Sequence, residues 1–100
     1  MREYLIWAAD GSGWIPIHKT RLHEVMLPQG WNAKRVQGWG DFRMVVDGVT
    51  ISFSGEEPGW QVTFEEGEME AARADSLLEQ LRSQVEVASG VPAQVVLITP

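Results

Sequence analysis

The strongest constraint on the fold is the segment FRMVVDGVTISF, residues 42–53, in which side chains alternate on both sides of Asp47-Gly48. An Asp-Gly pair tolerates the positive φ angles of a two-residue type I′ turn, and alternating apolar residues are typical of strands with one buried face. A register shift of one residue would turn every apolar side chain to the opposite face. We therefore predict a tight hairpin with three facing apolar pairs: Val46 with Val49, Met44 with Ile51, and Phe42 with Phe53.

Two further elements are expected after this hairpin. Pro58-Gly59 has turn composition, and the following WQVTFE alternates again, which predicts a third antiparallel strand. From about Met69 the apolar period changes to three and four residues, as in an amphipathic helix. Its first turn is expected to contain glutamates, which suit the positive end of a helix, and Gly90 and Pro92 are expected to end it. The predicted buried face of the helix consists of Ala74, Leu77, Leu78, Leu81, Val85 and Ala88.

The two ends of the chain are expected to add strands. EYLIWAA near the start and AQVVLI near the end are nearly continuous apolar runs, typical of strands that are covered on both sides or lie in mid-sheet. DGSG, residues 10–13, has turn composition, and WIPIH would return as a hairpin strand that Pro16 confines to an edge or a bulge. Residues 19–41 show no consistent period, although TRLHEVML suits one or two helical turns or a short strand. We expect an ordered loop there.

Together these elements predict a single α+β domain over residues 1–100. It consists of one antiparallel sheet of five or six strands with one long helix packed on one face, followed by a final strand. The 100 residues are 44% hydrophobic, which suits one core. The chain has no cysteine, and its apolar run at residues 5–9 is too short for a signal sequence or a membrane span. We therefore expect a cytoplasmic protein.

Charge is distributed unevenly along the chain. The net charge is −6, but residues 1–43 carry six basic and four acidic residues, whereas residues 44–100 carry two basic and ten acidic residues. An acidic chain is poorly suited to the phosphate backbone of nucleic acids. The six glutamates between positions 56 and 70 are interpreted as a solvated rim or as a negative surface for a basic partner.

Residues capable of catalysis or metal binding are sparse. His18 and His23 are five residues apart, which is neither the helical nor the strand spacing of a metal pair. Neither a glycine-rich phosphate loop nor a P-loop lysine is present. We therefore expect no metal and no cofactor. A small enzyme remains as one alternative, with His18 or His23 as general base and Asp10 or Glu24 orienting it.

The segment GWNAKRVQGWGDF, residues 30–42, contains the candidate binding residues Trp31, Lys34, Arg35 and Trp39. One interpretation is that both indoles pack over an open edge of the sheet. The other is that the four residues form an exposed aromatic and cationic patch of the kind found at binding hot spots. Packing is favoured, because a small domain cannot easily leave two indoles in water. Two cations are also too few for a groove that follows single-stranded nucleic acid.

These observations favour a small acidic protein that is not an enzyme and that acts through a macromolecular contact. Suitable classes are an inhibitor, an immunity or antitoxin-like factor, or an accessory subunit. The expected partner is another protein or a second copy of this chain, and neither nucleic acid nor a membrane. A second alternative is a homodimer that binds a small molecule in a tryptophan-lined pocket between helix and sheet.

Overall fold

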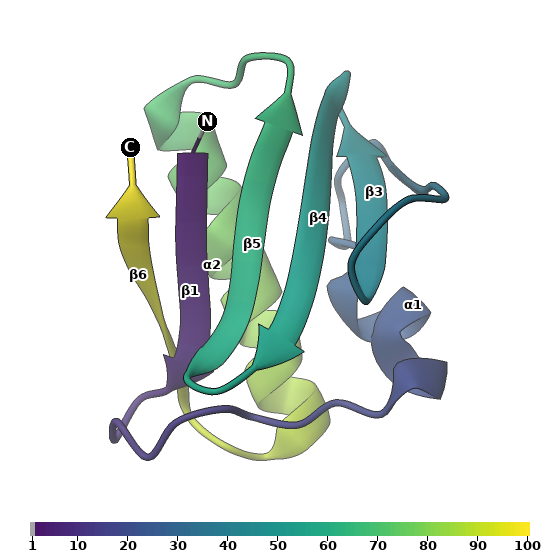
Figure 1. Ribbon diagram of the computed structural model, residues 1–100. Helices are drawn as coiled ribbons and strands as arrows, with labels where there is room; N and C mark the ends of the chain where they lie inside the picture. The colour runs from purple at the N-terminus through teal and green to yellow at the C-terminus, as the bar shows by residue number, and fades with distance from the viewer. Residues whose placement is uncertain (1) are drawn as a thin grey trace.

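The computed structural model describes residues 2–100 and confirms an α+β fold with one six-stranded antiparallel sheet (Figure 1). The strand order in the sheet is β2-β3-β4-β5-β1-β6, and one long helix packs on one face. The elements in chain order are β1 (Arg2–Ala8), the 3-10 helix η1 (Lys19–Arg21), α1 (Leu22–Met26), β2 (Ala33–Arg35), β3 (Phe42–Val46), β4 (Val49–Glu56), β5 (Gly59–Glu66), α2 (Ala71–Ser89) and β6 (Ala93–Thr99).

The hairpin around Asp47-Gly48 forms in the predicted register. Val46 faces Val49, Met44 faces Ile51 and Phe42 faces Phe53, and all six side chains are buried. Both turn residues have positive φ angles, 50° and 79°, as a type I′ turn requires. The hairpin therefore supplies part of the apolar face of the sheet that forms the core.

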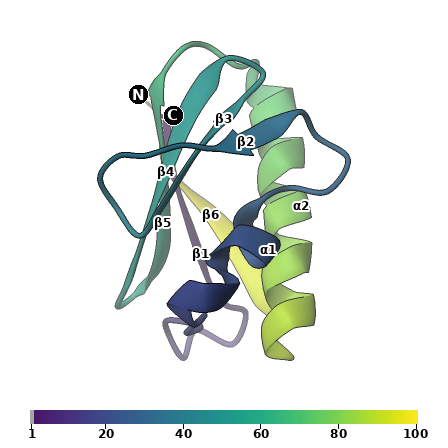
Figure 2. The same ribbon diagram turned by 90° about the vertical axis from the view of Figure 1, so that its right-hand side faces the viewer.

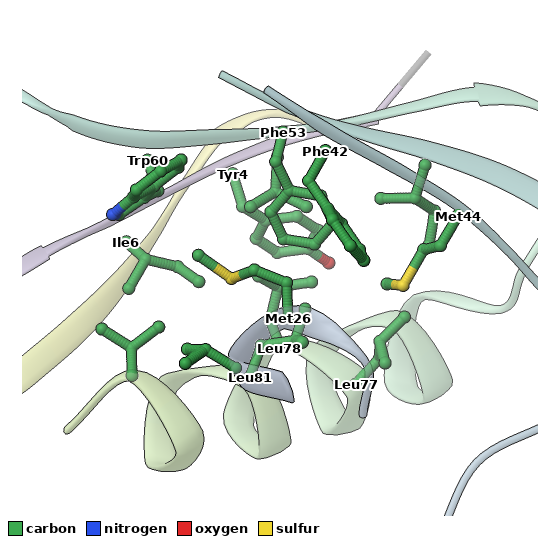
Figure 3. Close-up of a cluster of buried hydrophobic side chains, with 14 of the residues drawn as sticks. Tyr4, Ile6, Met26, Phe42, Met44, Phe53, Trp60, Leu77, Leu78 and Leu81 are labelled. Carbon is green, nitrogen blue, oxygen red and sulfur yellow. The ribbon is translucent and has the colours of Figure 1, made fainter. Parts of the chain in front are cut away.

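The helix α2 packs on this apolar face of the sheet through the helix face that was predicted. Its buried residues are Ala74, Leu77, Leu78, Leu81 and Val85, while Ala88 is partly buried. Figure 3 shows leucines of α2 pointing toward Phe42 and Phe53 of the sheet. Gly90 ends the helix in the left-handed conformation, with φ 74°, and its N–H donates to the carbonyl of Glu86 at 2.8 Å. The expected glutamate-rich first turn is wrong, because Glu70 is still extended and the helix begins after it.

The strand β5 follows β4 as predicted, with Trp60, Val62 and Phe64 buried on the core side. The turn consists of Glu57 and Pro58, so Gly59 is already the first residue of the strand.

The two terminal strands occupy different environments. β1 lies inside the sheet between β5 and β6, as its apolar run indicates. The expectation that AQVVLI would be covered on both sides or lie in mid-sheet is wrong, because β6 is an edge strand. Its residues Val96, Leu97 and Ile98 are 36%, 44% and 50% exposed. The reason is topological: β5 occupies one side of β1, and β6 pairs with the other side, beyond which no strand of residues 2–100 follows.

Residues 10–18 connect β1 to the helical region across one end of the sheet (Figure 1). The predicted turn is present, since the Gly11 N–H donates to the carbonyl of Ala8 at 3.0 Å. The predicted strand WIPIH is not, because these residues join no sheet. Their role is to close the core, and the Trp60 indole N–H donates to the carbonyl of Ile15 at 2.8 Å.

The loop expected for residues 19–41 contains three short elements, η1, α1 and β2. The helical interpretation of TRLHEVML is confirmed, and Leu22, Val25 and Met26 of α1 are buried. Within residues 2–100, every helix is too short or too polar to cross a membrane.

Candidate functional site

The helices α1 and α2 cover one face of the sheet and leave the other face open toward the viewer of Figure 1. A polar row crosses this open face, in which Arg43, Ser52, Thr63 and Glu3 are successive neighbours on β3, β4, β5 and β1. Arg43 forms an ion pair with Glu65 at 3.0 Å, and both side chains are largely buried. The Thr63 hydroxyl donates to Glu3 at 3.3 Å. The middle of the open face is therefore a polar row ordered by these contacts, in which Ser52 and Thr63 are themselves buried.

The connection between β2 and β3, residues 36–41, projects on the side of the sheet away from α2 (Figure 2). It is anchored at both ends, because the Val36 N–H donates to the carbonyl of Arg43 at 2.9 Å and the Asp41 N–H donates to the carbonyl of Phe53 at 2.8 Å. Asp41 Oδ2 also accepts from the Gly55 N–H at 2.7 Å. We call residues 36–41 the anchored loop.

Glycine is required within the anchored loop. Gly40 has φ +92°, and a Cβ at this position would lie 2.8 Å from the carbonyl oxygen of Phe53. The loop can therefore lie close to the β4 backbone only without a side chain here. The preceding residue, Trp39, is left 54% exposed and is the most exposed aromatic residue of the described chain.

The strand β2 was missed by the sequence analysis, since three residues among glycines and polar residues give no periodic signal. Lys34 lies opposite Val45 and Arg35 opposite Met44, and both cations are exposed. The Arg35 guanidinium lies 4.8 Å from the centre of the Phe42 ring. Charged residues on an edge strand also discourage pairing with another sheet.

Trp31 differs from Trp39 in its surroundings. It is partly buried against the core, and the guanidinium of Arg73 on α2 lies 4.4 Å from the centre of its ring. Trp31 therefore lies on the helix side of the sheet, whereas the anchored loop lies on the other side (Figure 2). No ring contact, ion pair or side-chain hydrogen bond in residues 2–100 joins Trp39 to Trp31, Lys34 or Arg35.

A signal for the exposure of Trp39 is present in the sequence GWGD, because an indole flanked by two glycines has no neighbouring apolar residue with which to form a strand face. The Asp41 anchor has no such signal, since its partner Gly55 is distant in the chain. The structure thus separates the four candidate residues. Trp31 is packed, and the other three are exposed, but Lys34 pairs with Val45 of the open face whereas Arg35 pairs with the buried Met44 and lies over the Phe42 ring on the helix side.

A pocket lined by tryptophans is present, but not between helix and sheet, where the small-molecule hypothesis expected it. A pocket of about 350 Å³ is lined by Trp14 and Trp60. It lies between residues 14–22 and the ends of β4 and β5, not between α2 and the sheet. His18 lines this pocket, and its Nδ1 accepts from the Thr20 N–H at 3.2 Å.

The remaining acids and histidines are dispersed. Glu24, the proposed orienting acid, is paired with Arg21 at 2.8 Å. Residues 2–100 contain no group of three or more His, Cys, Asp or Glu side chains that could hold a metal ion. The glutamates do not form one rim, because Glu56 and Glu57 lie at one end of β5, and Glu66, Glu68 and Glu70 at the other.

Comparison with known proteins gives no match: no protein-family model, no curated protein and no solved structure is similar to this chain.

Proposed function

We propose that this chain is a non-enzymatic protein-binding domain that contacts another protein through Trp39, with Lys34 on the same side of the sheet and Arg35 excluded because it lies on the helix side. The observation that carries the proposal is the exposed indole of Trp39 on a loop anchored at both ends. A small domain normally buries such a side chain, and loops held on a rigid scaffold often carry binding residues. An inhibitor, an immunity or antitoxin-like factor, and an accessory subunit all use a contact of this kind.

Preorganisation supports the same proposal. The backbone of the anchored loop is held at both ends by hydrogen bonds to β3 and β4, so the loop loses little conformational entropy on binding and more of the burial of Trp39 contributes to affinity. Tryptophan and arginine are also the residues most enriched at binding hot spots. The partner that fits this surface has an apolar pocket for the indole and an acidic residue opposite Lys34.

Affinity capture from the native host lysate, with quantitative mass spectrometry, tests this function. The wild type is compared with Trp39→Ala and with a control, Val87→Ala, which removes an apolar side chain that is 83% exposed on α2. We expect a protein that the wild type and the control retain and that Trp39→Ala loses by at least tenfold, since a hot-spot residue contributes about 2 kcal/mol or more. Far-UV circular dichroism checks that both variants are folded. Equal retention by all three proteins, or no captured protein, would contradict the proposal.

The pocket lined by Trp14 and Trp60 supports a second candidate, the binding of a small molecule. Native mass spectrometry of the freshly purified protein distinguishes the two. A bound small molecule, together with the absence of a captured protein, favours the pocket.

A further inference from the structure

The edge strand β6 presents an uncharged apolar surface. Val96, Leu97 and Ile98 are exposed on it, and the last ten residues of the chain, 91–100, contain no charged side chain. Natural edge strands are usually protected by charges, by a proline within the strand or by a covering segment. The opposite edge, β2, has such protection in Lys34 and Arg35. On β6 the pairing with β1 is regular from Ala93 to Leu97 and is interrupted after it, where Tyr4 pairs with Leu97 but Glu3 pairs with Thr99.

The backbone of β6 shows which groups are unpaired. The Ala9 N–H donates to the carbonyl of Pro92 at 2.8 Å, and in an antiparallel ladder alternate residues then point toward the neighbouring strand. Pro92, Gln94 and Val96 therefore direct their backbone groups toward β1. The residues between them, Ala93, Val95 and Leu97, direct their N–H and C=O groups away from the sheet.

Only the first of these three outward residues has partners. The Ala93 N–H donates to Glu86 Oε1 at 2.9 Å, and the Ala93 carbonyl accepts from Arg82 at 3.4 Å. No loop or side-chain hydrogen bond within residues 2–100 reaches the outward groups of Val95 and Leu97. The helix thus covers the start of the β6 edge and leaves its apolar second half open.

We propose that two copies of this chain pair through β6, antiparallel and about a two-fold axis at Val96. In this register Val95 of each copy faces Leu97 of the other, and every outward N–H of these residues donates to an outward C=O across the interface. Val96 then faces Val96 of the second copy, so that apolar side chains meet on the open face of the sheet.

A second copy fits this edge because the edge is complementary to itself. The unpaired groups lie symmetrically on the two sides of Val96, which is the condition for a two-fold antiparallel pair. Each copy has a net charge of −6, but residues 91–100 contain no charged side chain, and the charged side chains Arg82 and Glu86 beside the contact form an ion pair with each other at 3.1 Å. The anchored loop adjoins β2 at the other edge of the sheet, so the dimer would present two Trp39 side chains to partners.

Cysteine cross-linking tests the register, because the natural chain contains no cysteine. Residues that face each other in a non-hydrogen-bonded antiparallel pair have Cα atoms about 4.5 Å apart, within the range of a disulfide. Under mild oxidation we expect Val96→Cys to become a covalent dimer. The controls Leu97→Cys and Val87→Cys should remain largely monomeric, since residue 97 faces residue 95 of the other copy and residue 87 lies on α2.

Sedimentation equilibrium of the uncross-linked protein is the second measurement. The wild type should show a dimer whose dissociation constant rises at least tenfold in Val96→Lys and is unchanged in Val87→Lys. Both positions are exposed valines, so the control matches the added charge. The proposal is overturned if the wild type is monomeric at about 1 mM, if Val96→Lys leaves the dimer intact, or if Leu97→Cys cross-links as readily as Val96→Cys.

Discussion

The different surroundings of the two loop tryptophans lead to opposite effects of the same substitution. Trp31 is partly buried against the core beneath Arg73, and Trp39 is 54% exposed. Replacing a fully buried tryptophan by alanine costs about 3–5 kcal/mol. For the partly buried Trp31 we expect Trp31→Ala to lower the free energy of unfolding by about 2 kcal/mol, of which the cation–π contact supplies about 0.5–1 kcal/mol. Trp39→Ala should change it by less than about 0.5 kcal/mol.

Urea unfolding followed by far-UV circular dichroism measures both values without relying on tryptophan fluorescence. An unchanged slope with denaturant would show that only stability has changed. For a domain of this size, 2 kcal/mol corresponds to a fall in Tm of about 8–16 °C. If Trp31→Ala and Trp39→Ala lowered the free energy of unfolding equally, both indoles would contribute to the core, and the distinction between a packed Trp31 and an exposed Trp39 would be refuted.

A double-mutant cycle isolates the contact between Trp31 and Arg73. Arg73 also pairs with Asp47, so Arg73→Met alone removes two interactions. The coupling energy between Trp31→Ala and Arg73→Met excludes the Asp47 pair and should be about 0.5–1 kcal/mol. A coupling energy near zero would show that the guanidinium does not stabilise the indole.

Two further predictions concern single polar side chains. The Gln84 amide donates to the carbonyls of Val25 and Leu27 at 2.7 and 2.9 Å. Gln84→Ala should therefore lower the free energy of unfolding, measured by urea titration, by about 1–3 kcal/mol. An unchanged free energy of unfolding would show that water replaces both hydrogen bonds at no cost in stability. Burial raises the pKa of Tyr4, whose hydroxyl donates to Asp75 at 2.8 Å, and tyrosinate absorbance of this sole tyrosine should show it titrating above its usual value of 10.0. The folded state holds this proton more tightly than the unfolded state, so the free energy of unfolding should fall as the pH rises above 10.0. Tyr4→Phe should reduce this fall. A tyrosine titration midpoint at 10.0 would contradict the effect of burial on the pKa.

The elements that could be predicted from the amino-acid sequence are those with local signals. The Asp47-Gly48 turn fixed the register of β3 and β4, and the alternation of Trp60, Val62 and Phe64 predicted β5. The three- and four-residue spacing predicted the face of α2, and Gly90 its end. These features follow from backbone preferences and from neighbours two to four residues apart, so a short stretch of sequence is enough to specify them.

The edge strands and the contacts between distant side chains could not be predicted from the sequence, because they depend on how the strands pair in three dimensions. The apolar run of β6 is typical of a central strand, yet β6 lies at the edge, because β5 pairs with the inner side of β1 and β6 with its outer side. Trp31 and Trp39 have similar polar neighbours in the chain, but Arg73 covers one and the anchored loop exposes the other. The order of the strands depends on which strand edges are still unpaired when each strand joins the sheet. Local sequence patterns do not contain this information.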